Sequence, residues 1–254
     1  MRWIPFMIFI IVVQWYAFQA IKTITQNKFW WAIYALVVGI ILGGVLWQTL
    51  NFDRTVGWTP IEAYSLGMFV ALLSGQLLMI CLLFLEDLSR GASSLLHFFT
   101  SDQKIHFPQR RKFVSQIAIA LGAIPFSSLL YGMYKGRYNY RVLNYTLEYE
   151  NLPDGFDGFQ ITQISDLHCG SFDNTKKVAY GLDLIDKQKS DLVLFTGDMV
   201  NNKANEARPW VEFIAKIKAP YGKFSVLGNH DYGDYSDWEI APRETQNMVV
   251  MYHI

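Results

Sequence analysis

The sequence predicts a multi-pass α-helical membrane domain followed by an α/β domain. Two patterns in the chain predict this division. The first half of the 254-residue chain holds four long uncharged apolar runs, and the second half alternates short apolar strands with amphipathic helices. A third observation agrees: only 17% of the residues are charged, whereas a soluble domain has about 25%. We therefore expect residues 1–137 to form the membrane domain and residues 138–254 the α/β domain.

Each of the four apolar runs is long enough to cross a bilayer as a helix. Charged residues bound all four of them: Trp3–Ile21, Phe29–Phe52, Ala63–Leu85 and Phe113–Tyr134. A hydrocarbon core of about 30 Å needs about 20 apolar residues in helical rise. A cleavable signal peptide is the alternative for the first run, but that run is long for one and three more follow it. Four transmembrane helices are therefore predicted.

Lysine and arginine near the runs favour one orientation. If residues 22–28 and 86–112 face the cytoplasm, that side carries seven of these residues against five on the other side. The positive-inside rule then places both chain ends, and with them the α/β domain, outside the cytoplasm. Apolar residues within the second loop also suggest a short helix on the membrane surface; they are Leu95, Leu96, Phe98 and Phe99.

The second half predicts a parallel sheet. Short β-favouring runs lead into Asp166, Asp198 and Asn229, and between them lie two predicted helices, Thr175–Lys187 and one that starts at Asn205 or Glu206. Strands that alternate with helices pair in parallel through right-handed crossovers, so the three strands end at one edge of the sheet. A further half-buried strand is predicted over Tyr138–Glu150, where apolar and polar residues alternate.

Polar side chains that can bind metal ions follow each of the three strands. They are Asp166 and His168 after the first strand, Asp198 after the second, and Asn229, His230 and Asp231 after the third. Ligands of α/β sheets bind outside the carboxyl ends of the strands. Oxygen and imidazole ligands suit Mn, Fe, Zn or Mg, and a carboxylate can bridge two ions. Any one of these residues alone would be read as a turn former or a satisfied polar group, but the set predicts a metal site.

These motifs resemble those of the calcineurin-like metallophosphoesterase superfamily, which read D-x-H, G-D-x and G-N-H-[DE]. They stand here as Asp166-Leu167-His168, Gly197-Asp198-Met199 and Gly228-Asn229-His230-Asp231. With the four runs before it, the domain resembles a membrane-anchored bacterial branch of that superfamily. The resemblance implies the first half of a four-layer α/β/β/α sandwich, in a protein of a bacterial inner or plasma membrane.

The resemblance also implies a role for each site residue. Asp166 and His168 would hold a first divalent metal ion, Asp198 would bridge both ions, and Asn229 would bind the second. His230 would donate a proton or stabilise the transition state, with Asp231 orienting its ring. The implied activity is hydrolysis of a phosphomonoester, phosphodiester or pyrophosphate bond. Because the domain is anchored, we expect a phosphate-bearing substrate at the membrane, either lipid-linked or derived from the envelope, although the anchor could also serve only to localise the enzyme.

The last part of the chain departs from the superfamily pattern. The superfamily completes its two metal sites with three further histidines, whereas only His253 follows His230 here. We therefore expect a truncated chain or fragment with little or no hydrolase activity of its own. The alternative function is that of a non-catalytic membrane protein whose degenerate domain binds metal or a partner. A small transporter is disfavoured, because tyrosines and Cys81 are the only ionisable residues in the four runs.

The remaining features exclude other classes. The formal net charge of zero gives no indication of nucleic-acid binding. Cys81 and Cys169 do not form a disulfide framework. A thiol at position 169 could matter beside the Asp-x-His motif, but a small space-filling residue is the favoured interpretation. His97 and His106 are expected to lie away from the metal site.

Overall fold

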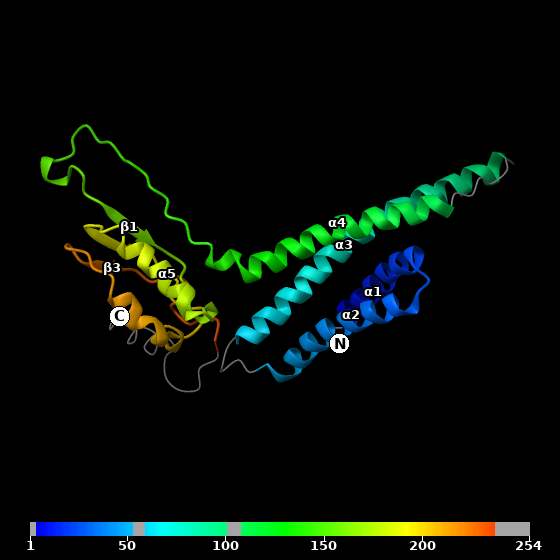
Figure 1. Ribbon diagram of the computed structural model, residues 1–254, viewed down its shortest axis with the longest axis horizontal. Coiled ribbons are helices and arrows are strands. Elements are labelled where there is room, and N and C mark those ends of the chain that lie inside the picture. Colours follow the sequence, from blue (N-terminus) through cyan, green and yellow to red (C-terminus); the bar gives the residue numbers. More distant parts are fainter. Residues whose placement is uncertain (1–3, 53–58, 101–107, 237–254) are drawn as a thin grey trace. The chain divides into compact units, whose positions relative to one another are not determined.

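The computed structural model describes residues 4–52, 59–100 and 108–236 and contains two compact units (Figure 1). Met1–Asn51 and Tyr64–Gly136 make up the helical unit, and Phe52–Ala63 and Arg137–Ile254 make up the α/β unit. His106 and His253 lie outside the described residues.

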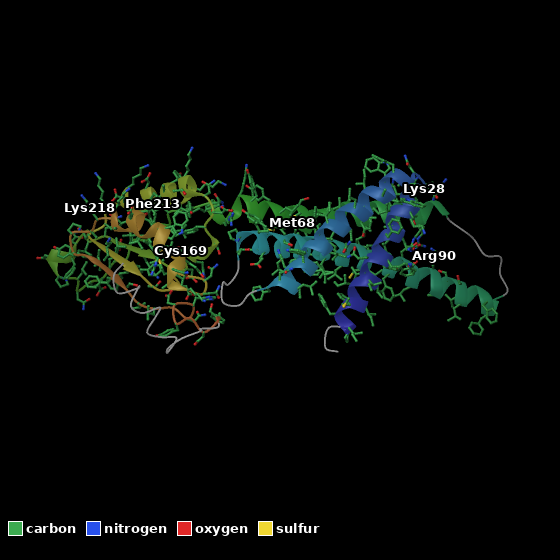
Figure 2. The ribbon with its side chains drawn as sticks, turned by 90° about the horizontal axis from the view of Figure 1, so that it is seen from below. Lys28, Met68, Arg90, Cys169, Phe213 and Lys218 are labelled. Atoms are coloured by element: carbon green, nitrogen blue, oxygen red, sulfur yellow. The ribbon has the colours of Figure 1, made fainter. Side chains whose placement is uncertain are left out.

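The helical unit contains the four predicted transmembrane helices. They are α1 (Ile4–Ile24), α2 (Lys28–Asn51), α3 (Pro60–Thr100) and α4 (Pro108–Tyr134). In the described part of the chain, four helices are long and apolar enough to cross a membrane. Large apolar side chains cover their outer surfaces (Figure 2), which suits contact with lipid.

Helix α3 is longer than predicted. Residues 86–100 continue α3, so the prediction of a loop that carries a separate surface helix there is wrong. Glu86 can remain in the helix because Arg111 of α4 binds its carboxylate at 2.5 Å. The hydroxyl groups of Ser89 and Ser93 donate to carbonyl oxygens of the preceding turn. The charges that appeared to end the third run are therefore paired within the helical unit.

Small residues bring the helices close together. A Cβ atom on Gly75 would lie 2.6 Å from the carbonyl oxygen of Gly122, so the backbones of α3 and α4 meet at this point. Ala17, Ala20 and Ala118 are fully buried in the same unit. Close backbone approach at small residues is the usual means by which helices pack in lipid.

The α/β unit is built on a three-stranded parallel sheet. Its strands β1 (Ile161–Ile164), β2 (Leu192–Phe195) and β3 (Lys223–Ser225) lie in the order β1-β2-β3. Helix α5 (Thr175–Asp186) connects the first two strands, and α6 (Val211–Ala215) lies between the second and third. The predicted parallel α/β architecture is confirmed. The second helix is shorter than expected, because the chain first forms 3₁₀ turns, one of which contains Pro209, and proline lacks an amide donor.

The core of this unit lies on one face of the sheet. Ile164 and Phe195, which pair in register, pack with Val178 of α5 and with Trp210. Figure 2 labels Cys169, which is part of the same buried cluster. On the opposite face, Phe224 is 61% exposed. The helices therefore cover one side of the sheet within the described residues.

The predicted strand over Tyr138–Glu150 is wrong. Gly136–Tyr138 form a 3₁₀ turn, residues 139–149 have no regular secondary structure, and the alternating side chains of Leu143, Tyr145 and Leu147 are all exposed. Alternation predicts a strand only where a partner strand and a core are present. Within the described residues, the sheet provides this segment with no partner strand, and the side chains of Leu143, Tyr145 and Leu147 have no core to pack on.

Candidate metal centre

Two loops run side by side beyond the carboxyl ends of β1 and β2. The amide of Asp166 donates to the carbonyl oxygen of Gly197 at 3.0 Å, and the amide of His168 donates to that of Asp198 at 3.0 Å. These hydrogen bonds continue the pairing of the two strands past their ends. The residues of the first two motifs are therefore held in a fixed register.

The backbone at these loops is unusual. Asp166, His168 and Asp198 have φ values of 54°, 46° and 59°. They are three of the four non-glycine residues with positive φ in the described part of the chain. Side chains other than glycine rarely adopt this left-handed conformation, and residues that do so tend to cluster at functional sites.

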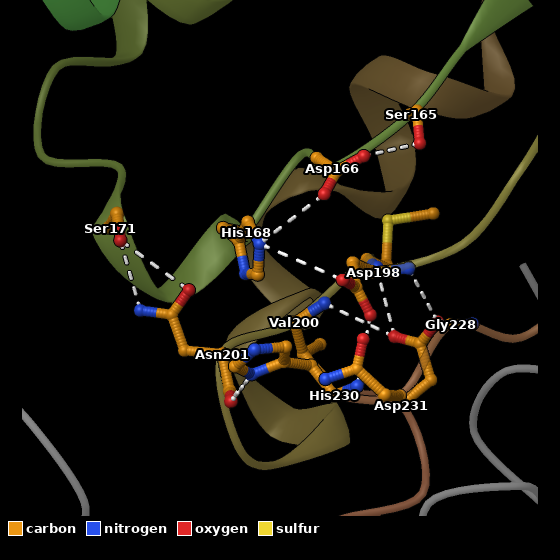
Figure 3. A network of polar contacts seen from close by, with 12 residues as sticks. Ser165, Asp166, His168, Ser171, Asp198, Val200, Asn201, Gly228, His230 and Asp231 are labelled. Atoms are coloured by element: carbon orange, nitrogen blue, oxygen red, sulfur yellow. Dashed lines mark hydrogen bonds and ion pairs between the residues drawn. The ribbon is translucent and has the colours of Figure 1, made fainter.

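The side chains of the three motifs converge at this edge of the sheet (Figure 3). One ligand atom each from His168, Asp198 and His230 lies within 4.8 Å of the others. Nε2 of His168 lies 3.9 Å from a carboxylate oxygen of Asp166 and 3.9 Å from one of Asp198. Two carboxylates and two imidazoles form a donor set that fits a divalent transition metal.

The loop after β3 approaches the loop after β2 closely enough to require glycine. A Cβ atom on Gly228 would lie 2.2 Å from Oδ1 of Asp198, and one on Gly197 would lie 2.4 Å from the nitrogen of Gly228. In this close contact the amide of His230 donates to Oδ1 of Asp198 at 2.9 Å. Oδ1 is thus fixed by the backbone, while Oδ2 lies towards His168.

Asp231 has a different role from the predicted one. Its side chain is fully buried, and its carboxylate accepts the backbone amides of Asp198, Met199 and Gly228 at 2.8–2.9 Å, with that of Val200 at 3.3 Å. Nδ1 of His230 instead lies 2.7 Å from the carbonyl oxygen of Asn201. These hydrogen bonds connect the Asp231 carboxylate to the loops after β2 and β3, and the ring of His230 contacts the carbonyl oxygen of Asn201.

Comparison with known protein families gives two matches. Residues 1–137 match the family described as "Probable Calcineurin-like phosphoesterase, transmembrane domain", and residues 159–252 match "Calcineurin-like phosphoesterase". The chain belongs to the membrane-anchored calcineurin-like phosphoesterases. It is therefore a membrane protein with a phosphoesterase domain, as the motifs predicted.

Curated relatives of this chain come from bacteria and animals. An uncharacterized metallophosphoesterase, YkuE of Bacillus subtilis, is 31% identical over 131 residues, which cover 50% of this chain and 46% of the relative. The Danio rerio "Transmembrane protein with metallophosphoesterase domain" is 24% identical over 84% of this chain and 47% of its own length. A Chlamydia trachomatis protein named UDP-2,3-diacylglucosamine pyrophosphatase LpxG is 35% identical over 94 residues, 35% of this chain and 29% of the relative.

The chain spans about half the length of the first two relatives, at 46% and 47%. No solved structure matches it.

Three further residues of the candidate metal centre were not predicted from the sequence. Asn201 supplies the carbonyl oxygen that faces His230. Glu206 accepts the backbone amides of Asn201 at 2.7 Å and of Lys203 at 3.1 Å, which fixes the loop that carries this carbonyl. Neither residue belongs to a local sequence motif, because their interactions involve backbone atoms: the carbonyl oxygen of Asn201, and the loop amides that the Glu206 carboxylate accepts.

Tyr235 is the third unpredicted residue. Its hydroxyl oxygen accepts a hydrogen bond from the side-chain amide of Asn229 at 3.0 Å, and its ring lies 4.6 Å from that of His230. With its amide nitrogen engaged by Tyr235, Asn229 keeps its side-chain oxygen as the atom able to bind a metal ion.

Cys169 packs in the core of the phosphoesterase unit and is not one of the candidate metal ligands. The residue is 1% exposed, and its sulfur contacts that of Met199 at 3.8 Å. Burial, with the nearby carboxylate of Glu206, raises the pKa of the Cys169 thiol to about 12. The space-filling interpretation therefore fits the structure.

Proposed function

We propose that this chain contributes metal-binding residues to a phosphoesterase centre that hydrolyses phosphoester or pyrophosphate bonds with two divalent metal ions. The observation that carries the proposal is the convergence of His168, Asp198 and His230 within 4.8 Å at the carboxyl ends of parallel strands. Membership of the calcineurin-like phosphoesterases supports the same reaction class.

We assign the roles as follows. Asp166 and His168 would hold one ion, Asp198 would be shared by both, and Asn229 would hold the other. The ions, when bound, lower the pKa of a bound water and neutralise charge on the phosphoryl oxygens. Mn, Fe, Zn and Mg all suit this donor set.

His230 acts as the proton donor. Its Nδ1 is engaged by the carbonyl oxygen of Asn201 at 2.7 Å, and the amide of the same residue is fixed on Asp198 at 2.9 Å. Because a carbonyl oxygen only accepts, Nδ1 carries a proton, and Nε2 is the ring nitrogen left to face the leaving oxygen, to which it would donate from the doubly protonated ring. A histidine in hydrogen-bond reach of the leaving group is a common general acid.

We further propose a substrate at the membrane surface, outside the cytoplasm of a bacterial cell. The four helices keep the domain beside the bilayer, which favours a lipid-linked or envelope-derived phosphate compound. The pyrophosphatase named for the Chlamydia trachomatis relative is compatible with this class. The excess of lysine and arginine at residues 22–28 and 86–112 supports the orientation.

Metal binding tests the proposal directly. We expect Asp198→Asn to abolish high-affinity Mn²⁺ binding by the purified chain, measured by electron paramagnetic resonance of free Mn²⁺, because the variant loses the bridging carboxylate. Asp183→Asn is the matched control, since Asp183 lies exposed on α5. Equal Mn²⁺ binding by both variants would remove the metal assignment.

Turnover is a separate test. Only one histidine follows His230 in this chain, so hydrolysis of bis(4-nitrophenyl) phosphate is measured on a version extended by the carboxy-terminal half of the domain from a relative. We expect Mn²⁺-dependent hydrolysis that Asp198→Asn eliminates. Hydrolysis that persists in that variant would contradict the assigned mechanism.

A further inference from the structure

The first residues after the last membrane helix bind the loop that carries the metal ligands. Arg137 directly follows Gly136, the last residue of the helical unit. Its guanidinium forms an ion pair with Asp173, and the two side chains are 28% and 27% exposed. The same guanidinium donates to the carbonyl oxygen of Ser171 at 3.1 Å.

Tyr138 strengthens this attachment. Its hydroxyl donates to Oδ1 of Asp173 at 2.6 Å and accepts the amide of Asp173 at 3.1 Å. Two cations lie close to its ring, with Cζ of Arg137 at 4.8 Å and Nζ of Lys177 at 4.7 Å from the ring centroid. Cations over an aromatic face are attracted to it. We call Arg137, Tyr138, Asp173 and Lys177 the linker clamp.

Ser171 connects the linker clamp to both histidines of the metal centre. Its amide donates to the carbonyl oxygen of His168 at 2.8 Å, within the 3₁₀ turn Cys169–Ser171. Its hydroxyl accepts a hydrogen bond from the side-chain amide of Asn201 at 2.9 Å, as Figure 3 shows. The carbonyl oxygen of Asn201 in turn faces Nδ1 of His230.

We propose that Arg137 and Tyr138 are positioning residues of the metal centre. By fixing Ser171, the linker clamp holds His168 in its left-handed conformation and keeps the Asn201 carbonyl on the ring of His230. The residues that leave the membrane therefore form part of the support of the site, in addition to tethering it. This inference rests on the proposed function of the centre as a metal site.

Mn²⁺ affinity of the full chain tests the clamp. We expect Arg137→Ala to weaken Mn²⁺ binding by about tenfold, a typical loss when an outer support of a metal ligand is removed. Tyr138→Phe removes only the hydroxyl and should weaken binding by about threefold. Arg137→Lys keeps a cationic donor for the Asp173 carboxylate and the Ser171 carbonyl oxygen, and should lose less affinity than Arg137→Ala. Arg141→Ala is the matched control, because Arg141 is exposed four residues further along.

Two comparisons separate positioning from general stability. Val178→Ala destabilises the core of the same unit, since Val178 is 2% exposed, and should leave Mn²⁺ affinity within about twofold of wild type. Hydrogen exchange should rise at residues 169–173 and 201–203 in Arg137→Ala but not in β2. Unchanged affinity in Arg137→Ala, or an equal loss in Val178→Ala, would overturn the inference. Absent Mn²⁺ binding by the wild-type chain would instead overturn the proposed function.

Discussion

Buried polar side chains have different partners in the two units. In the helical unit, Gln14 of α1 and Gln76 of α3 exchange two amide hydrogen bonds of 2.7 Å, and Gln76 also donates to the hydroxyl of Tyr34 at 2.9 Å. In the phosphoesterase unit, the carboxylates of Asp231 and Glu206 accept backbone amides. In the helical unit these side chains form hydrogen bonds with other side chains, whereas in the phosphoesterase unit they accept hydrogen bonds from main-chain amides.

The state of the backbone explains this difference. A membrane helix satisfies its own amides and carbonyls, and the buried side chain of Gln76 finds its partners on other helices. The loops beyond the strands leave amides without partners, and each buried amide needs an acceptor. The glutamine pair therefore joins helices, whereas the carboxylates set the shape of the loops that carry the metal ligands.

The largest effect is expected at Asp231. Asp231→Asn turns an acceptor of several amides into a group whose NH₂ opposes one of them, at a site with no access to water. We expect the phosphoesterase unit to lose about 3–5 kcal/mol of unfolding free energy, measured by urea unfolding with hydrogen exchange of β2 as the probe. Asp183→Asn, on the exposed face of α5, should change the free energy by less than about 0.5 kcal/mol.

A loss below about 1 kcal/mol in Asp231→Asn would contradict this account. It would mean that the loops keep their conformation without the Asp231 carboxylate. The hydrogen bonds between this carboxylate and the loop amides would then contribute little to the unfolding free energy.

The convergence of the candidate metal-binding residues His168, Asp198 and His230 could be predicted because it follows from the ends of parallel strands. Asp166, Asp198 and Asn229 each follow a short β-favouring run, and parallel pairing brings such ends to one edge. The role of Asp231 could not be predicted in the same way. Its partners are amides of a loop about 30 residues earlier in the chain, and only the folded conformation of that loop presents them.

The two errors in secondary structure have a common cause. The sequence ends the third apolar run before Glu86 because the uncharged stretch stops there, and it predicts a strand over residues 138–150 because their side chains alternate. In both cases the secondary structure depends on a partner residue or strand from another part of the chain. Arg111 provides one for Glu86, whereas the described sheet provides none for Leu143 or Tyr145.

A smaller effect is expected at the glutamine pair. Gln76→Leu leaves the side chains of Gln14 and Tyr34 without this partner inside the helical unit and should cost about 1–2 kcal/mol. The double variant Gln14→Leu with Gln76→Leu should cost less than the sum of the two single variants, because it leaves fewer unsatisfied groups. Reversible unfolding of the helical unit in mixed detergent micelles measures all three. Ser74→Ala is the control, since that hydroxyl donates within its own helix.

Additive costs in this cycle would show that the two amides do not interact. The buried polar groups of the helical unit would then contribute individually and not as a pair.

The smallest expected effect is at the cysteines, one of which lies in each unit. Cys81 is exposed on α3, whereas Cys169 is buried in the core of the phosphoesterase unit. Burial raises the pKa of the Cys169 thiol to about 12. A raised pKa leaves less of the reactive thiolate: at pH 8 about one thiol in ten thousand is ionised, against about one in four for a free thiol.

We therefore expect iodoacetamide at pH 8 to leave Cys169 unmodified in a folded Cys81→Ser background, and to label it rapidly once the unit is unfolded in urea. Mass spectrometry of the peptide that contains residue 169 measures the extent. Asp231→Asn in the same background should increase labelling of the folded protein, because opening of the loops exposes the neighbouring sulfur. Labelling of the unaltered protein at the rate of a free cysteine would contradict the burial of this thiol, and with it the packing of the first metal-binding loop against the core.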